Sequence, residues 1–162
     1  MDGIDGILCG TSIVILSFSN FLIPSSLYII IGSLIGFIFF NWSPSKIFMG
    51  DIGSNFLGTY FVWILLNSYS FNNSFAILLI ASPIILDPAI CLVRRAYYKQ
   101  NIFEAHSLHL YQRLNQAGWS HSKVSLLYIS LVILEFLSLR LLSLKMEIIA
   151  TLFIIFLGVF LE

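Results

Sequence analysis

Residues 48–54 read Phe48-Met49-Gly50-Asp51-Ile52-Gly53-Ser54 and form a polar, glycine-containing stretch between two apolar runs, residues 21–41 and 55–66. Gly50 and Gly53 permit backbone conformations that other residues avoid, and they let N–H groups approach a ligand closely. Asp51 offers the hard oxygen that Mg²⁺ prefers, and Ser54 is a suitable N-cap for the next helix. The stretch is therefore either an ordinary turn joining two membrane helices or part of a site for a metal-bound diphosphate.

The composition of the chain is that of an integral membrane protein. Of its 162 residues, 59% are hydrophobic and only 10% are charged, and the mean hydropathy is +0.96. A soluble domain has about 45–50% apolar and about 25% charged residues. Eight basic and eight acidic residues cancel, and no basic tract suggests nucleic acid as a partner.

Six apolar segments predict an all-α, polytopic membrane helix bundle with about six transmembrane helices. A spanning helix needs about 20 mainly apolar residues, and no alternation typical of a closed barrel is visible. The segments cover residues 7–23, 26–42, 55–70, 74–93, 124–141 and 146–161. Cys9 and Cys91 lie in apolar runs and are interpreted as packing residues.

The order of these segments places the polar stretches, residues 2–6, 41–54 and 94–123, on one side of the membrane. That side also holds six of the eight basic residues, which are Lys46, Arg94, Arg95, Lys99, Arg113 and Lys123. The other side holds Arg140 and Lys145. Because basic residues favour the cytoplasmic side, we expect the polar stretches to face the cytoplasm from the inner (plasma) membrane.

The first polar stretch, Met1-Asp2-Gly3-Ile4-Asp5-Gly6, sets two carboxylates three residues apart. If the next helix begins here, Asp2 and Asp5 lie on one side of its first turn. Acidic residues at this position also stabilise a helix through its dipole, so a purely structural role is open.

Asp87 lies inside the fourth apolar segment, in Leu86-Asp87-Pro88. Ionisable groups within a membrane are costly and are candidates for function. Asp87 could instead pair with Arg94 or Arg95, with Pro88 kinking the helix, and the sequence favours this structural interpretation slightly.

The long polar stretch contains Glu104-Ala105-His106-Ser107-Leu108-His109-Leu110-Tyr111-Gln112-Arg113. If this segment is helical, His106, His109 and Arg113 share one face. Two imidazoles and a guanidinium are suited to binding an anion or moving a proton beside a phosphate, although a solvated amphipathic helix gives the same pattern. His-x-x-His without a third ligand does not indicate zinc. His121 is interpreted as an interfacial residue.

Taken together, the stretches 1–6, 48–54 and 105–114 resemble those of the polyprenyl-phosphate sugar-1-phosphate transferases, known as glycosyltransferase family 4. This family includes undecaprenyl-phosphate N-acetylglucosamine-1-phosphate transferases and phospho-N-acetylmuramoyl-pentapeptide transferases. The resemblance covers essentially all of residues 1–162 as the C-terminal part of such an enzyme, with motif loops at 1–6, 43–54 and 94–123. The Tyr111-Gln112-Arg113 form of the last motif is more similar to enzymes that initiate O-antigen and other cell-envelope polysaccharides.

The resemblance implies a Mg²⁺-dependent transfer of a sugar 1-phosphate from a UDP-sugar to undecaprenyl phosphate. It implies that Asp51 binds the metal and that Asp2 lies near the reacting phosphate. It also assigns His106 and His109 to the diphosphate or sugar. The remaining implied substrate-binding residues are Asp5, Phe48, Gly50, Ser54 and Arg113.

The chain departs from the family pattern because it lacks the upstream helices and their paired aspartates, and because Ser107 stands where relatives often have a basic residue. We therefore expect a fragment or one part of a split transferase, with little turnover alone and with a separate N-terminal part and a homo-oligomer as further possible partners. The alternative is a catalytically inactive membrane remnant or assembly partner. A transporter is less well supported, since midplane charges and inverted repeats are not evident.

Overall fold

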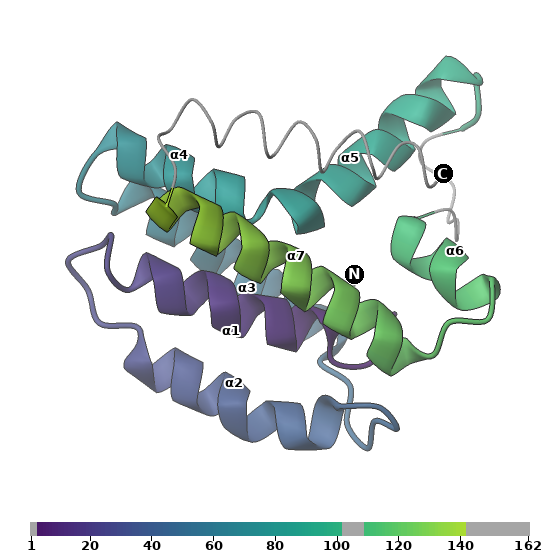
Figure 1. The fold of residues 1–162 in the computed structure, drawn as a ribbon, viewed down its shortest axis with the longest axis horizontal. Helices are drawn as coiled ribbons and strands as arrows, with labels where there is room; N and C mark the ends of the chain where they lie inside the picture. Colours follow the sequence, from purple (N-terminus) through teal and green to yellow (C-terminus); the bar gives the residue numbers. More distant parts are fainter. Residues whose placement is uncertain (1–2, 102–108, 142–162) are drawn as a thin grey trace.

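The computed structural model describes residues 3–101 and 109–141, and this part of the chain is all-α (Figure 1). It contains seven helices and no strand, which confirms the predicted helical class. The helices are α1 (Ile7–Ser19), α2 (Tyr28–Asn41), α3 (Gly50–Leu66), α4 (Phe71–Ile80), α5 (Ser82–Tyr97), α6 (Leu110–Gln116) and α7 (His121–Leu141).

Helix α1 lies at the centre of the described structure, between α2 on one side and α7 on the other (Figure 1). A Cβ atom at Gly10 would overlap the side chain of Ile129, so a glycine in α1 allows α7 to approach closely. Helix α4 also packs on α1 and α7, whereas α6 packs on the first part of α7. The residues that begin α1 and α7 are thereby held near one another.

The hydrophobic core forms around α1. One cluster joins α1 to α2, α3 and α4 through buried side chains that include Cys9, Leu34, Leu57 and Ile77. A second cluster joins α1 to α4 and α7 through Ile15, Ile80, Ala81 and Val132. Cys9 and Cys91 are both fully buried, in agreement with their interpretation as packing residues.

The helices follow four of the predicted apolar segments but differ in their ends. Helices α1, α2 and α7 correspond to the segments at 7–23, 26–42 and 124–141. The predicted segment at 74–93 contains two helices, because α4 and α5 meet at Ala81 with a bend of 71°. Pro83, at the start of α5, has no N–H with which to continue the bonding of α4. The segment at 146–161 lies outside the described residues.

Helix α3 begins five residues before the predicted segment at 55–70, so most of the stretch 48–54 is helical. Met49 occupies the N-cap position, and the prediction of Ser54 as N-cap is wrong. Ser54 lies within the helix and donates a hydrogen bond from Oγ to the carbonyl of Asp51 at 3.2 Å. Gly50 has φ +67°, which explains why a glycine stands where the chain turns into α3.

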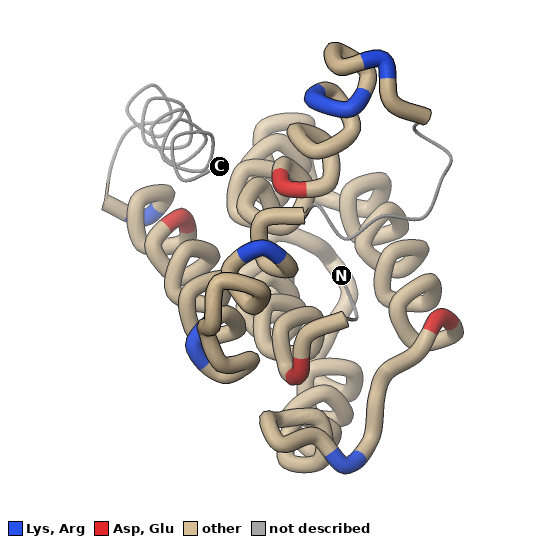
Figure 2. The backbone as a smooth tube through the Cα atoms, turned by 90° about the vertical axis from the view of Figure 1, so that its right-hand side faces the viewer, with Lys and Arg blue, Asp and Glu red and all other residues tan. Residues whose placement is uncertain are grey.

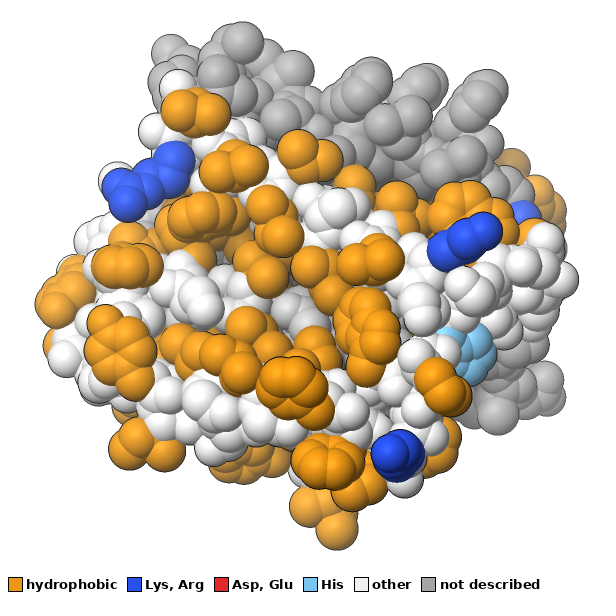
Figure 3. Space-filling view, turned by 60° about the horizontal axis from the view of Figure 1, so that its bottom comes forward, with side chains coloured by type: hydrophobic (Ala, Val, Ile, Leu, Met, Phe, Trp, Pro, Cys, Tyr) orange, Lys and Arg blue, Asp and Glu red, His pale blue; other side chains and the backbone are white. Residues whose placement is uncertain are grey.

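Many large hydrophobic side chains lie on the surface. Among the described helices, α7 has the length and the apolar character of a membrane span, and α4 and α5 meet the same criteria only as a bent pair. Helices α1 and α2 are apolar but shorter. Figure 3 shows hydrophobic side chains spread over one face of the molecule, with basic side chains mainly near its edges. The exposed set includes Ile29, Phe39, Phe56, Leu66 and Val93.

Candidate functional site

Asp5 is buried at the entrance to α1, with only 8% of its surface exposed. Its Oδ1 accepts a hydrogen bond from Ser45 Oγ at 2.9 Å, and its Oδ2 accepts one from the backbone N–H of Ser45 at 3.3 Å. His121 Nδ1 lies 3.3 Å from Asp5 Oδ2. One carboxylate thus joins the turn before α1, the loop after α2 and the first residue of α7.

The local chain path explains why Asp5 reaches these partners. Gly6 has φ +76°, and its N–H donates to Asn41 Oδ1 at 3.1 Å. Asn41 in turn donates from Nδ2 to the carbonyl of Ile47 at 3.0 Å, which ties down the loop that carries Ser45. Helix α1 begins only at Ile7, so Asp5 precedes the first turn in which the sequence pattern had placed it.

The surroundings of Asp5 favour its charged form. Burial by itself raises the pKa of this carboxyl, but the hydrogen bonds from Ser45 and the contact with His121 outweigh burial. The pKa of Asp5 therefore lies below its usual value of 3.8. Its negative charge is present at neutral pH and is fully engaged by the protein.

Asp87 forms a second buried centre on α5. Its Oδ1 accepts a hydrogen bond from the backbone N–H of Leu110 at 2.9 Å. Its Oδ2 accepts one from Tyr128 Oη at 2.6 Å and a longer one from the N–H of Tyr111 at 3.5 Å. The predicted pairing with Arg94 or Arg95 is not what holds Asp87, because the partners that bind its carboxylate come from α6 and α7.

His109 stands directly before α6, in an extended conformation at the N-cap position. Its N–H donates to Gln112 Oε1 at 3.3 Å, and its Nδ1 lies 3.7 Å from Asp87 Oδ1. The imidazole stacks on the ring of Tyr111, with centroids 5.4 Å apart. Helix α6 begins at Leu110, so His109 precedes the helix that carries Arg113. His106, the other member of the predicted helical face, lies outside the described residues.

Apolar contacts connect the two carboxylate centres. Ile4 and Ile7 pack with Tyr111 of α6 and with Val124 and Tyr128 of α7. We call the following residues the buried polar cluster: Asp5, Asn41, Ser45, Asp87, His109, His121 and Tyr128. Parts of the first and third polar stretches, together with the loop after α2, therefore lie side by side at one end of the molecule.

The α3 entry, which we define as Phe48, Gly50, Asp51 and Ser54, is different. Phe48 is 64% exposed and Asp51 is also exposed in the first turn of α3. None of the hydrogen bonds or ion pairs found among the described residues joins Asp51 to Asp5, Asp87 or His109. The structure thus brings together Asp5 and the residues around His109, and it leaves Asp51 exposed at the start of its own helix.

The described acidic residues are scattered over the molecule (Figure 2). Within residues 3–101 and 109–141, no group of three or more His, Cys, Asp or Glu side chains could hold a metal ion. Mg²⁺ in transferases is commonly bound by one or two carboxylates, while water and substrate phosphates supply the other ligands. A single exposed carboxylate such as Asp51 is suited to this mode of binding. It could not by itself form a metal site in which the protein supplies all the ligands.

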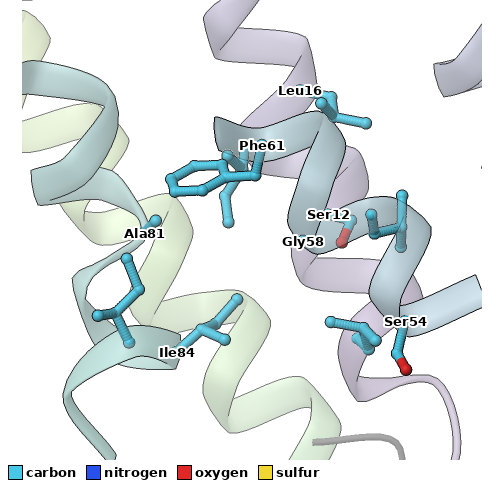
Figure 4. Close-up of a pocket in the computed structure, with 11 residues that line it drawn as sticks. Ser12, Leu16, Ser54, Gly58, Phe61, Ala81 and Ile84 are labelled. Atoms are coloured by element: carbon cyan, nitrogen blue, oxygen red, sulfur yellow. The ribbon is translucent and has the colours of Figure 1, made fainter. Parts of the chain in front are cut away.

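An apolar cavity of about 210 Å³ lies beside the α3 entry (Figure 4). It is lined by α1, α3 and the residues at the α4–α5 bend, including Ser12, Ser54, Gly58, Phe61 and Ala81. Figure 4 shows Ser12 and Ser54 as the labelled residues with hydroxyl groups among otherwise apolar side chains. Ser54 therefore lies at the edge of a cavity, although the cavity is suited to an apolar group and not to a diphosphate.

Of two other predicted site residues, the structure describes one. Arg113 lies in the last turn of α6 and is partly buried. Asp2 lies outside the described residues.

Sequence reasoning missed the residues that assemble the cluster. Asn41 is the last residue of α2, Ser45 lies in the loop that follows, and Tyr128 is an aromatic residue in an apolar run. Their spacing in the sequence does not indicate that they belong to the site. The sequence also gives no sign that His121, interpreted as an interfacial residue, contacts Asp5. A buried carboxylate needs hydrogen-bond donors, so the presence of Asp5 and Asp87 in apolar surroundings indicates that donors lie nearby in the fold. The sequence does not show which residues those donors are.

Comparison with known proteins adds the family. The model of glycosyl transferase family 4 matches residues 1–69. A Bacillus subtilis protein named as a probable undecaprenyl-phosphate N-acetylglucosaminyl 1-phosphate transferase is 36% identical over 144 residues, covering 82% of this chain and 40% of the relative. A phospho-N-acetylmuramoyl-pentapeptide-transferase of Latilactobacillus sakei is 32% identical, covering 77% of this chain and 41% of the relative.

A second phospho-N-acetylmuramoyl-pentapeptide-transferase, from Staphylococcus haemolyticus, is 34% identical and covers 76% of this chain and 40% of the relative. The chain thus spans about two fifths of the length of the curated relatives it matches. No solved structure matches the chain. Through residues 1–69 by the family model, and through about four fifths of its length by these relatives, the chain belongs to glycosyl transferase family 4.

Proposed function

We propose that this chain forms the C-terminal part of a membrane transferase that moves a sugar 1-phosphate from a UDP-sugar to undecaprenyl phosphate. The observation that carries the proposal is the buried polar cluster. Residues 3–6, the loop at 41–47, α6 and the start of α7 are far apart in the sequence and are joined by the carboxylates Asp5 and Asp87. Two of these segments, residues 3–6 and most of α6, belong to stretches through which the chain resembles its family, and the loop at 41–47 directly precedes the third such stretch, residues 48–54.

The residues of the cluster would prepare the site rather than perform every step of the reaction. Asp5 already uses its carboxylate oxygens on Ser45 and His121, so we assign it to the shape of the pocket near the uridine. His109 stands at the N-cap of α6, where its imidazole can hold the diphosphate or sugar. Arg113, one turn further along α6, would add positive charge beside the phosphates.

The α3 entry would bind the donor. Phe48 has an exposed ring that can stack on uracil, and the positive φ of Gly50 leaves backbone room for a close ligand. Asp51 would hold Mg²⁺ together with the diphosphate. When bound, the metal would neutralise charge on the diphosphate and on the departing UMP.

The proposed reaction is a substitution at phosphorus. An oxygen of undecaprenyl phosphate forms a bond to the β-phosphorus of the UDP-sugar, and the bond from that phosphorus to the bridging oxygen breaks, releasing UMP. The protein's own contribution is to align the two phosphates and to stabilise their charge. Asp2 and His106, which also belong to this proposal, would lie near the reacting phosphates.

We place the protein in the inner (plasma) membrane, with six spanning helices and the cluster on the cytoplasmic side. Support comes from the mean hydropathy of +0.96, the apolar helices and the exposed hydrophobic surface in Figure 3. The excess of basic residues in the stretches that carry the cluster is typical of the cytoplasmic side. The products of such a transferase would serve cell-wall, O-antigen or other cell-envelope polysaccharide synthesis.

The proposal is tested by binding of UDP-N-acetylglucosamine to the purified full chain in detergent, with and without Mg²⁺. We expect Mg²⁺ to strengthen binding to the wild type and to have no effect on Asp51→Asn. Asn55→Ala, an exposed change on the same helix, is the matched control. Equal affinity of wild type and Asp51→Asn in the presence of Mg²⁺ would remove the metal assignment, and a complete absence of binding would remove the donor site.

A second candidate is a non-catalytic membrane subunit that keeps the family's packing and assembles with other transferase polypeptides. The observation that favours it is that Asp5 and Asp87 are both buried and held by the protein's own donors, as carboxylates in a purely structural core are. UMP release from the donor in the presence of undecaprenyl phosphate separates the two candidates. Turnover by the purified chain supports the enzyme, whereas donor binding or membrane assembly without turnover supports the subunit.

A further inference from the structure

Asp87 is a buried carboxylate that the proposed reaction does not use. Only 7% of its surface is exposed, and it lies on α5, after the bend at Ala81. A carboxylate at such a site is costly unless hydrogen bonds satisfy it. The question is therefore what Asp87 achieves with its bonds.

The donors to Asp87 come from two other helices. Backbone N–H groups of Leu110 and Tyr111 at the start of α6 donate to the two carboxylate oxygens, at 2.9 Å and 3.5 Å. The hydroxyl of Tyr128, in α7, donates at 2.6 Å. Helix α6 has only seven residues, so it has little stability of its own and depends on such contacts for its position.

His109 is the residue most directly affected by this arrangement. Asp87 accepts a hydrogen bond from the N–H of Leu110, the residue that follows His109. The Nδ1 atom of His109 lies 3.7 Å from Asp87 Oδ1. Its ring also stacks on Tyr111, which is itself packed against Tyr128. The backbone and the ring plane of His109 are thus set by Asp87 or by groups bound to it, and the ring nitrogen Nδ1 lies within ion-pair distance of the Asp87 carboxylate.

We propose that Asp87 is a positioning residue, which docks α6 on α5 and α7 and fixes the orientation of the His109 imidazole. The ligand toward which His109 is oriented, a nucleotide-sugar diphosphate, rests on the function proposed above. The docking and the orientation do not depend on that function. Asp87 acts through His109 and does not touch the substrate.

Asp87→Asn tests the charge with little change in shape, because the amide keeps one acceptor oxygen. Hydrogen exchange measures the docking of α6 in the purified chain without any ligand. We expect the amides of residues 110–113 to exchange at least about tenfold faster in Asp87→Asn, since hydrogen bonds to a charged group are the stronger kind. Tyr128→Phe removes a single donor and should give a smaller acceleration, while Ser130→Ala, an exposed change on α7, should give none.

The histidine ring signals of His109 in an NMR spectrum report its orientation, again without ligand. We expect these signals to move in Asp87→Asn and to stay in place in Ser130→Ala. A role limited to helix packing would accelerate exchange in α6 but would leave the His109 signals of the folded state unchanged. Unchanged exchange, or unchanged His109 signals, in Asp87→Asn would overturn the proposal.

Donor binding then gives a double-mutant cycle. Asp87→Asn should weaken binding of UDP-N-acetylglucosamine with Mg²⁺ about tenfold, and His109→Gln at least as much. Because Asp87 acts through His109, the double variant should bind within about twofold of His109→Gln alone. Additive losses would overturn the link between the two residues. Should the wild type not bind the donor at all, the proposed function fails, and the exchange and NMR results still decide the role of Asp87.

Discussion

The buried polar cluster and the α3 entry are both polar regions in a strongly apolar chain, and they are built in opposite ways. In the cluster, Asp5 and Asp87 are buried and each carboxylate is held by two other segments, that of Asp5 by Ser45 and His121 and that of Asp87 by α6 and α7. In the α3 entry, Asp51 is exposed and makes no hydrogen bond or ion pair through its side chain to the cluster. Both regions contribute residues through which the chain resembles one family.

This difference separates two uses of a carboxylate. A buried carboxylate whose oxygens are all engaged stabilises the fold and shapes a pocket, and its loss exposes unsatisfied donors. An exposed carboxylate is available to an external cation or ligand, and its loss changes stability little. Substitutions should therefore affect stability strongly in the cluster and weakly in the α3 entry.

The largest loss of stability is expected for Asp87→Ala. It leaves the N–H groups of Leu110 and Tyr111 and the hydroxyl of Tyr128 without their acceptor in a buried site. We expect a loss of about 3 kcal/mol, which corresponds to a fall in Tm of roughly 6–12 °C in a chain of this size. Thermal unfolding in detergent measures it. A change below about 1 kcal/mol would mean that the three donors find other partners.

The second largest loss of stability is expected for Gly6→Ala. The backbone of Gly6 has φ +76°, and a Cβ there would lie 2.8 Å from the ring of Trp42. We expect a loss of about 2 kcal/mol, from strain in the backbone and displacement of the indole. Gly32→Ala, in α2, is the control, since a Cβ at that glycine has open space around it. Equal effects of the two substitutions would contradict a special role for the Gly6 turn.

Asp5→Asn should cost about 1 kcal/mol at neutral pH, because Ser45 loses a charged acceptor but keeps an amide oxygen. The pKa of Asp5 in the folded protein lies below 3.8, so its contribution is complete above that pH and is lost as the pH falls through the lowered value. The difference in Tm between wild type and Asp5→Asn should therefore shrink below about pH 4. A difference that grows in acid would contradict this assignment.

The smallest effect on stability is expected for Asp51→Asn, below about 0.5 kcal/mol, from the weaker interaction with the dipole of α3. Its Tm should match that of the wild type within about 2 °C. A fall as large as that of Gly6→Ala would show that Asp51 is part of the packed structure, and the contrast between the two regions would be lost.

The helical class and most helix positions could be predicted because they follow from hydropathy along the chain. Helices α2 and α7 lie within a few residues of their expected ends. The bend at Ala81 was not predicted, because the apolar run continues through it and only Pro83 marks the change. The early start of α3 was missed because Gly50 and Asp51 are typical of turns, yet both are helical here.

The candidate site was predictable in its segments but not in its contacts. Asp5 and His109 were singled out by residue type and spacing, and the structure brings their segments together. The roles of Ser45 and Tyr128 could not be predicted, since they arise from tertiary contacts. Ser45 binds Asp5, which is 40 positions away in the sequence, and Tyr128 binds Asp87, which is 41 positions away. The predicted placement of Asp2 and His106 falls outside the described residues, and the roles of Phe48 and Asp51 stay predictions.

The break between α4 and α5 has a consequence for depth in a bilayer. A ten-residue helix such as α4 rises about 15 Å, which is half of a hydrocarbon layer about 30 Å thick. If α4 starts at one surface of the proposed membrane, the chain changes direction near the midplane, where the apolar cavity beside Ala81 opens. Helix α5 then leaves at an angle to α4, and its Asp87 meets the first residues of α6 instead of continuing straight across the lipid.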